Sequence, residues 1–371
     1  LTLTLGTRYF DIENSMVGAN MGSFYCKVYG TGESGPCTGD LYGYGDETAP
    51  YGTNIDEQED NKNQTDGFKS RANLTWRITG DALVYATWSE GYRPGGFNRG
   101  TALVANDVAG LDPQYARPTS YEEDDLTNIE VGWKTTFWGG RAQFNGAIYQ
   151  VTWENAQTGF FAPQLGFGNL QFFTNGPDYE VNGVEFDVVV APLDGLTLTA
   201  AGSYNKGELT NSPQLINNIE GSPGFGQPIT ENCVDGNGNG VCDPNEIVPV
   251  SDVYGPKGTE MANSPELQFN VRARYEWAWG DYNPYVGAAV QYQDESYSSA
   301  NVVNRFLMPS WTTWDAAIGI GRNSWNAEIY AINLTDENTS MYTTASQFII
   351  AEVPMRPRTM GLRVSYSFGG N

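Results

Sequence analysis

Apolar and polar residues alternate along most of this chain. In residues 267–277 every odd position is apolar or aromatic, and every even position is polar or charged. The same period of two recurs in 68–78, 128–137 and 360–368. Because successive side chains of a β-strand point to opposite faces, this period predicts strands with one apolar face. The chain is therefore expected to be all-β.

About twelve such strands can be counted, and they are long. They lie near 1–10, 66–78, 82–92, 126–137, 141–153, 180–191, 196–206, 265–278, 282–296, 310–321, 324–333 and 357–368. Many have 10 to 14 residues, whereas strands of soluble proteins usually have about 5–6. Tilted strands that cross a bilayer need about 9–11 residues, so these lengths favour a membrane-spanning sheet.

The connections between the strands alternate between short and long. The short ones lie at 79–81, 138–140, 192–195, 279–281 and 322–323. The long ones lie at 11–65, 93–125, 154–179, 207–264, 297–309 and 334–356. In an up-and-down antiparallel sheet, this order places every short turn at one end and every long loop at the other. An outer-membrane barrel has this layout, with periplasmic turns and surface loops.

A soluble β-sandwich also alternates apolar and polar residues, so the barrel needs further support. Strand length and the one-sided loops supply part of it. Aromatic residues near the short turns supply the rest, since barrels carry an aromatic girdle at the lipid–water boundary. These residues are Trp76, Trp138, Trp277, Trp279, Tyr282 and Trp325. Residues 1–371 are thus predicted to form one segment of an antiparallel transmembrane β-barrel.

The alternation also predicts which side chains face lipid and which face the lumen of the barrel. The residues expected to face lipid are Phe68, Leu74, Trp76, Val131, Trp133, Phe269, Val271, Leu362 and Val364. Those expected to face the lumen are Arg71, Asn73, Glu130, Arg272, Arg274 and Arg363.

Charge excludes one class of partner. The chain has 44 acidic and 20 basic residues, for a net charge of −24, which argues against a nucleic acid as a partner. Loop 11–65 alone holds ten acidic and two basic residues. The predicted outer surface is therefore acidic. It either meets the anionic sugars of lipopolysaccharide through divalent cations or simply keeps the loops soluble.

Histidine is absent from the chain. This excludes Ser-His-Asp and Cys-His catalysis and leaves no imidazole for zinc or haem. Carboxylate pairs of the glycosidase type need two acids about 5–10 Å apart, which a sequence cannot show. No enzyme activity and no haem or nucleotide cofactor are expected.

The four cysteines fall into two close pairs, Cys26 with Cys37 and Cys233 with Cys242. Both pairs lie in segments rich in Gly and Asp, which predicts two disulfides within loops and an oxidising compartment. A tetrathiolate metal site is the alternative, although the pairs lack the short spacing of such sites.

The stretch "ENCVDGNGNGVCDPNE", residues 231–246, has the spacing of a twelve-residue calcium loop. The expected ligands are Asp235, Asn237, Asn239, the Val241 carbonyl, Asp243 and Glu246, with Gly240 at the sharp turn. No helix pattern flanks the loop, so a structural Ca²⁺ in a surface loop is predicted, with the Cys233–Cys242 bridge holding the ends. A polar turn that matches by chance is the alternative.

Four stretches resemble the TonB-dependent outer-membrane receptors. They are "LTLTLGTRYF" (1–10), "VYATWSEGYRPGGFN" (84–98), "AINLTDEN" (331–338) and "PRTMGLRVSYSF" (357–368). The resemblance implies a barrel of about 22 strands that an N-terminal domain plugs. This chain departs from that pattern because it has no plug and only about twelve strands, which would be the last twelve. It also continues past Phe368 with "GGN".

The resemblance further implies a location and partners. The location is the outer membrane of a Gram-negative bacterium, where lipid and lipopolysaccharide surround a multi-pass barrel. A TonB-type energy transducer would be reached through a plug domain outside this segment. The expected substrate is a small-molecule chelate.

Within the motif "GYRPGG", glycines permit sharp turns and Pro94 prevents the ladder from continuing. The motif therefore ends a strand at the barrel mouth, where Glu90, Tyr92 and Arg93 are candidate substrate-binding residues. The alternative is a loop-shaping motif with a structural Glu–Arg pair. Loop aromatics such as Phe172 and Phe173 present a similar choice, between stacking on a ligand and packing on one another.

Two classes of function fit these observations. The first is an outer-membrane receptor for energy-dependent uptake of a scarce nutrient, most readily a ferric chelate (siderophore). The second is a passive porin or a structural or adhesive barrel. In either case residues 1–371 are not expected to close a barrel alone, since unpaired strand edges in lipid cost several kcal/mol for each bare backbone group.

Overall fold

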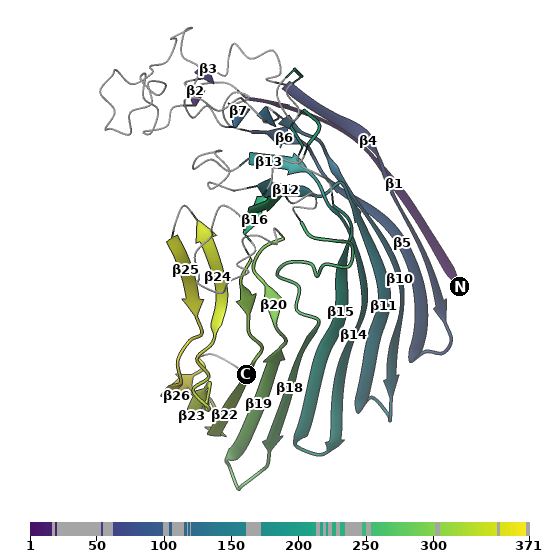
Figure 1. Ribbon diagram of the computed structural model, residues 1–371. Helices are drawn as coiled ribbons and strands as arrows, with labels where there is room; N and C mark the ends of the chain where they lie inside the picture. Colours follow the sequence, from purple (N-terminus) through teal and green to yellow (C-terminus); the bar gives the residue numbers. More distant parts are fainter. Residues whose placement is uncertain are drawn as a thin grey trace.

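The computed structural model is one strongly curved antiparallel sheet with small hairpins gathered at one of its ends (Figure 1). The structure describes residues 1–16, 19–20, 53–54, 62–98, 104–105, 115–116, 118, 120–160, 172–212, 216–217, 220–221, 225–227, 231–233, 247–249, 254–300, 305–346 and 349–368. No helix in these ranges is long and apolar enough to cross a membrane.

Twelve long strands form the sheet, and each pairs with its neighbours in chain order. They are β1 (Thr2–Ser15), β4 (Lys62–Arg77), β5 (Ala82–Arg93), β10 (Asp124–Phe137), β11 (Ala142–Glu154), β14 (Asp178–Leu193), β15 (Leu196–Asn211), β18 (Leu267–Glu276), β19 (Asn283–Gln293), β22 (Trp311–Arg322), β23 (Trp325–Ile332) and β26 (Thr359–Tyr366). The twelve strands that the alternation predicts are therefore confirmed.

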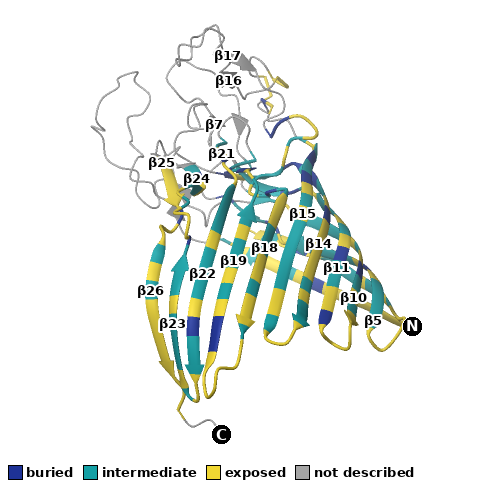
Figure 2. Ribbon diagram, turned by 90° about the horizontal axis from the view of Figure 1, so that it is seen from below, coloured by how far each residue is buried: buried dark blue, intermediate teal, exposed yellow. Residues whose placement is uncertain are grey.

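The short turns lie together at one end of the sheet (Figure 2). Four of the five contain a residue with positive φ, namely the turns at 138–140, 192–195, 279–281 and 322–323. Asn323 has φ 50° and Gly195 has φ 83°. A side chain at Gly195 would also overlap the Glu276 carbonyl, so glycine is required there by both geometry and space.

Within the described ranges, fourteen short strands pair as seven small hairpins or bridges outside the main sheet. They are β2 (Ala19–Asn20) with β3 (Thr53–Asn54), β6 (Gly96–Phe97) with β9 (Ser120–Tyr121), β7 (Val104–Ala105) with β8 (Tyr115–Ala116), β12 (Gln157–Phe160) with β13 (Phe172–Asn175), β16 (Glu231–Cys233) with β17 (Ile247–Pro249), β20 (Ser296–Tyr297) with β21 (Leu307–Met308), and β24 (Ser340–Ser346) with β25 (Ile349–Pro354). The sequence pattern did not predict them, because most are too short to show a period of two.

The strand register separates the side chains of the sheet into two faces. One row across five strands joins Trp133, Gly146, Phe186, Gly202 and Phe269. All nine residues predicted to face lipid lie on this face, and all six predicted to face the lumen lie on the other. We call them the outer face and the inner face.

The inner face is identified by contacts that reach across a whole strand. The Tyr149 hydroxyl on β11 donates to Asn205 Oδ1 on β15, past β14. The Tyr285 hydroxyl on β19 donates to Glu328 Oε2 on β23, 2.9 Å away, past β22. Contacts of this kind favour the concave side of a curved sheet. The opposite face leaves large apolar side chains uncovered, Leu362 for example being 70% exposed, as a lipid-facing surface requires.

Tyrosine rings on the inner face lie over glycines of the next strand. The pairs are Tyr85 with Gly132, Tyr149 with Gly183, Tyr285 with Gly319 and Tyr330 with Gly361. A glycine leaves room for the ring, so the ring lies close to the sheet. Its hydroxyl can then reach a polar group nearby, as Tyr85 reaches Glu130 Oε1 at 2.6 Å.

The sheet is open. Among the strands that the structure describes, β1 pairs only with β4, and β26 pairs only with β23. This agrees with the expectation that these twelve strands do not close a barrel by themselves.

Candidate ligand site at the loop end of the sheet

The candidate residues Glu90, Tyr92 and Arg93 lie in the last four residues of β5. The strand ends at Arg93, directly before Pro94, as the motif predicts. All three side chains are engaged in contacts within the chain, and each contact has a different chemistry.

Glu90 completes the ladder between β4 and β5. Regular pairing of these strands ends at Arg71 and Ser89. The next amide of β4, Ser70 N, donates to Glu90 Oε2 at 2.9 Å. A carboxylate thus replaces the backbone carbonyl at the point where the two strands separate, so the Ser70 amide keeps an acceptor.

Tyr92 is part of an aromatic contact with the first strand. Its ring stacks on Phe10, with centroids 3.8 Å apart and an interplanar angle of 20°. The Lys69 ammonium lies 5.5 Å from the centre of the Tyr92 ring and also pairs with Asp125. Phe10 is buried, so this stack joins β1 to the end of β5.

Arg93 pairs with Asp124, the first residue of β10. Its Nε lies 2.9 Å from Asp124 Oδ2, and its Nη2 donates to the same oxygen. The guanidinium carbon lies 4.9 Å from the centre of the Trp153 ring. The sequence suggested a structural Glu–Arg pair as one alternative, and this is wrong. Arg93 pairs with Asp124 instead, whereas Glu90 accepts a hydrogen bond from a backbone amide.

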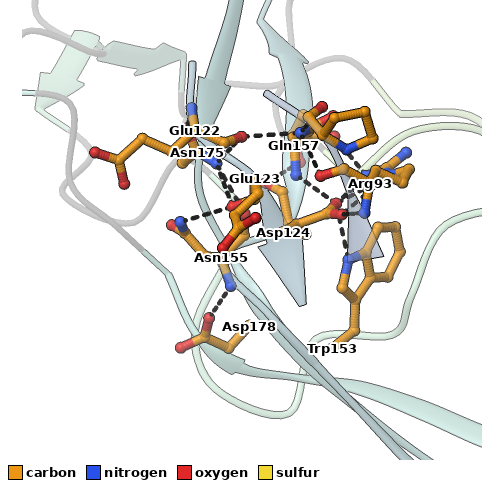
Figure 3. A network of polar contacts seen from close by, with 12 residues as sticks. Arg93, Glu122, Glu123, Asp124, Trp153, Asn155, Gln157, Asn175 and Asp178 are labelled. Atoms are coloured by element: carbon orange, nitrogen blue, oxygen red, sulfur yellow. Dashed lines mark hydrogen bonds and ion pairs between the residues drawn. The ribbon is translucent and has the colours of Figure 1, made fainter. Parts of the chain in front are cut away.

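Asp124 collects donors from three strands. Besides Arg93, it accepts hydrogen bonds from Trp153 Nε1 at 3.0 Å and from the Gln157 amide at 3.1 Å. Figure 3 shows these groups converging on its carboxylate, which is only 2% exposed. We call Arg93, Asp124, Trp153, Gln157 and Asn175 the Asp124 network.

Charge at Asp124 is stabilised by these donors. About 9–11 residues suffice to cross a bilayer, and β10 reaches the short turn at Phe137, so Asp124 lies beyond the membrane-spanning part. Burial acts to raise the pKa of the Asp124 carboxyl, but hydrogen bonds from Arg93, Gln157 and Trp153 outweigh it and lower the pKa below its usual value. Asp124 is therefore ionised at neutral pH.

Amide side chains extend the network to the β12–β13 hairpin. Gln157 Nε2 donates to the Pro94 carbonyl at 2.9 Å and to the Glu122 carbonyl at 2.8 Å. Asn175 Nδ2 donates to the Glu122 carbonyl at 3.0 Å, while the Glu122 amide donates back to Asn175 Oδ1 at 2.6 Å. Side chains thus fix the hairpin against the end of β5 and the start of β10.

Sequence reasoning missed four members of this network. Asp124 lies in the acidic run "EEDD" (122–125), where no local pattern separates the buried acid from its neighbours. The other three members are distant in the chain. Trp153 and Gln157 lie 29 and 33 residues after Asp124, and Asn175 lies 52 residues after Glu123, whose carbonyl it binds. Their contacts depend on strand pairing, which only the folded chain shows.

Loop aromatics divide between packing and exposure. Phe172 is buried. Phe173, its neighbour, remains 39% exposed, and its ring centre lies 5.6 Å from that of Tyr121. Phe172 therefore packs within the hairpin, and Phe173 is the more accessible of the two at the loop end.

Two predicted features fall outside the described residues. The calcium ligands Asp235, Asn237, Asn239, Val241, Asp243 and Glu246 all lie there, as do Cys26, Cys37 and Cys242. Cys233 is described only as the backbone of β16. Within the described ranges, no group of three or more Asp, Glu, Cys or His residues is arranged to hold a metal ion.

Comparisons with known proteins agree on the fold. Residues 1–334 match the family model described as "TonB dependent receptor-like, beta-barrel". The chain is similar to the crystal structure of the ferric yersiniabactin uptake receptor FyuA from Yersinia pestis, with TM-score 0.59 and 16% identity over 86% of this chain and 40% of that one. It is similar to the ferric-catecholate import receptor Fiu from K12 E. coli, with TM-score 0.58 and 16% identity over 98% and 41%.

A third similar structure is the siderophore receptor PiuA from Acinetobacter baumannii, with TM-score 0.54 and 19% identity over 82% of this chain and 36% of that one. This chain therefore spans about two fifths of the length of the receptors that it matches. At these identities the structural likeness establishes the fold, and the family match extends over most of the chain.

Proposed function

Because this chain belongs to the TonB-dependent receptor-like β-barrel family, we propose that it forms the last twelve strands of an outer-membrane receptor for energy-dependent uptake of a ferric chelate. Members of this family are outer-membrane β-barrels of Gram-negative bacteria that act as receptors and transporters rather than enzymes. The energy would come from a TonB-type transducer, reached through a plug domain outside these residues.

The observation that carries this proposal is the division of the sheet into two faces and two ends. Its outer face is apolar, its inner face is polar, and its small hairpins gather at one end (Figure 1). Such a sheet separates lipid from a polar interior. The loop end then offers the surface that a solute from outside meets first.

The choice of a ferric chelate draws on the similar structures. FyuA, Fiu and PiuA are named as receptors for ferric yersiniabactin, ferric catecholate and siderophore. Accessible aromatic rings such as Phe173 suit the flat rings of such ligands. A chelate of this class is therefore the first substrate to test.

Glu90, Tyr92 and Arg93 are proposed to shape the receptor mouth. Their side chains hold the Ser70 amide, the Phe10 ring and the Asp124 carboxylate. Any ligand contact by these residues would come from the parts that remain exposed, chiefly the guanidinium edge of Arg93. The calcium loop at 235–246 and the two disulfides remain proposals for ordering the acidic surface loops.

Transport by the full-length receptor tests the function. The gene would be expressed in a Gram-negative strain that lacks its own ferric-chelate receptors, and uptake of radioactive iron would be measured with a panel of chelates. An energised receptor should accumulate iron from at least one chelate, and a protonophore should abolish the accumulation.

The control is diffusion through the purified receptor in lipid vesicles. Unselective flux of small sugars, with no energy-dependent uptake of any chelate, would favour the passive porin instead. If neither sugar flux nor chelate uptake is detected, a structural or adhesive barrel is favoured.

A further inference from the structure

Arg305 lies in the connection between β20 and β21, at the loop end of β19 and β22. Its guanidinium carbon is 3.9 Å from the centre of the Tyr297 ring. Its Nη1 is buried and has no hydrogen-bond acceptor among the residues that the structure describes. A buried donor without an acceptor is costly, and more so when it carries charge. This nitrogen therefore needs an explanation.

The other described cations at this end of the sheet are either paired with a carboxylate or exposed to water. Lys62, Lys69, Arg93, Lys206 and Arg358 each pair with a carboxylate. Lys257 and Arg356 are exposed, so water solvates them. Within the described part of the loop end, Arg305 combines partial burial with the absence of an acid partner. This is notable in a chain with 44 acidic residues.

The acidic residues close to Arg305 in the sequence do not form an ion pair with it. Asp294 Oδ1 instead accepts hydrogen bonds from the Tyr292 hydroxyl at 3.1 Å and from the Glu295 amide at 3.0 Å. The described residues hold no carboxylate within ion-pair distance of Arg305, although Asp294 and Glu295 lie directly before β20. The described residues thus leave the guanidinium charge without a counter-ion, and the partly exposed side chain can meet an acidic group from elsewhere.

The hairpin that carries Arg305 is well fixed. Ser298 N donates to the Phe306 carbonyl at 3.0 Å, and Phe306 N donates to Ser298 Oγ at 3.0 Å. Asn263 N also donates to the Tyr297 carbonyl at 2.7 Å. Tyr297 and the residue next to Arg305 are therefore held in place by neighbouring backbone, so little ordering is left for a ligand to impose.

Stacking on Tyr297 determines what Arg305 can bind. The ring covers one face of the planar guanidinium, and the N–H groups point outward in the plane of the group. Two such N–H groups match the two oxygens of a carboxylate, phosphate or catecholate. A neutral acceptor would satisfy the hydrogen bond but would leave the charge uncompensated.

We propose that Arg305, held flat by Tyr297, is an anion-binding site at the receptor mouth, and that it takes an oxyanion group of the imported ligand. The anion site stands on the geometry of Arg305 alone. Its assignment to the imported ligand rests on the proposed function. Two measurements separate these parts.

The first measurement uses selenate as a probe, because selenium scatters anomalously and the ion resembles sulfate. Crystals of the full-length receptor are soaked in selenate, and anomalous density is measured around residue 305. We expect a peak within about 4 Å of the guanidinium, the range of an ion pair, in the wild type and none in Arg305→Gln. Absence of the peak in the wild type, or its persistence in Arg305→Gln, would overturn the anion site.

The second measurement compares two ferric chelates on the purified full-length receptor. A ferric tris-catecholate is an anion, whereas a ferric tris-hydroxamate is neutral. Arg305→Gln should weaken binding of the anionic chelate roughly tenfold, the effect of losing one charged hydrogen bond, and leave the neutral chelate unchanged. Arg305→Lys should fall between the two, since it keeps the charge but loses the planar stack.

Lys257→Gln is the matched control, because it removes the same charge from an exposed position at the same end. Equal weakening by Lys257→Gln would show a general charge effect and contradict the site. If the wild type binds selenate at Arg305 but neither chelate, the anion site stands and the proposed ligand class is wrong.

Discussion

Two asparagines bind loop backbone in the same way at distant places in the chain. Asn98 Nδ2 donates to the Pro118 and Phe173 carbonyls, and its Oδ1 accepts from Phe173 N at 2.6 Å. Asn333 Nδ2 donates to the Glu337 and Arg356 carbonyls, and its Oδ1 accepts from Glu337 N at 2.8 Å. Both side chains are nearly buried. A buried amide with three of its bonding positions satisfied stabilises a loop without a hydrophobic core.

Asp124 is the residue whose replacement should matter most at the loop end. In Asp124→Asn, the charge that holds Arg93 is lost, and one side-chain oxygen becomes a donor that faces other donors. We expect destabilisation on the order of 2 kcal/mol, below the 3–5 kcal/mol of a fully buried pair because Arg93 is half-exposed. Hydrogen exchange at the Gln157 amide should accelerate accordingly.

Glu122→Gln is the control for this prediction. It removes one charge from the adjacent acidic run, but Glu122 contributes backbone atoms to the network rather than its exposed carboxylate. Its exchange rates should match the wild type. Similar rates in Asp124→Asn and Glu122→Gln would contradict the role of Asp124.

At the scale of one pair of strands, Gly319→Ala tests the Tyr–Gly contacts. A methyl group at 319 would overlap the Tyr285 ring. That ring cannot move easily, since Arg274 stacks on it at 3.6 Å and Glu328 holds its hydroxyl. We expect a loss of about 1–3 kcal/mol in the free energy of unfolding, as for other overpacked sites, measured by denaturant titration of the full-length receptor.

Gly287→Ala provides the comparison. Gly287 lies on the same inner face, but a methyl group there would meet only the Ala273 carbonyl, at 3.7 Å. This substitution should therefore change the free energy of unfolding very little. If both alanines are equally harmful, backbone freedom rather than ring packing explains the glycines.

A second prediction at this scale concerns the outer face. Val271→Arg places a charge among lipid-facing residues of β18 and should cost about 2–4 kcal/mol if the site lies near the bilayer midplane. Asn270→Arg, one residue earlier, points to the inner face and should be tolerated. Unfolding from lipid bilayers measures both. Equal costs would mean that the two faces are assigned incorrectly.

The long strands can be predicted from the sequence, whereas the small hairpins cannot. Strand β18 repeats its two-residue period over ten residues, so its existence, its faces and its neighbours follow from the pattern. Strand β20 has two residues and shows no period. Likewise, Glu90 and Arg93 are visible in a motif, but their partners Ser70 and Asp124 are set by strand pairing.

For the molecule as a whole, the open edges give the clearest prediction. The outer edges of β1 and β26 should each pair with further strands in the full-length receptor, because bare backbone groups in lipid cost several kcal/mol each. Amide hydrogens of both strands should then exchange as slowly as those of the interior strand β11. Fast exchange along β1 or β26 in the intact receptor would refute this pairing, as would a structure in which residues 1–371 form a sealed barrel alone.

Side chains bind the loop backbone near the strand ends. The strands and the loops therefore differ in how well they tolerate an inserted residue. One residue added within β10 would exchange its lipid-facing and lumen-facing side chains beyond that point. A residue added between Glu337 and Arg356, whose carbonyls Asn333 binds, changes only a small hairpin outside the main sheet. New binding specificities can therefore arise by lengthening and shortening loops, while the strands that carry them keep their register across many generations of change.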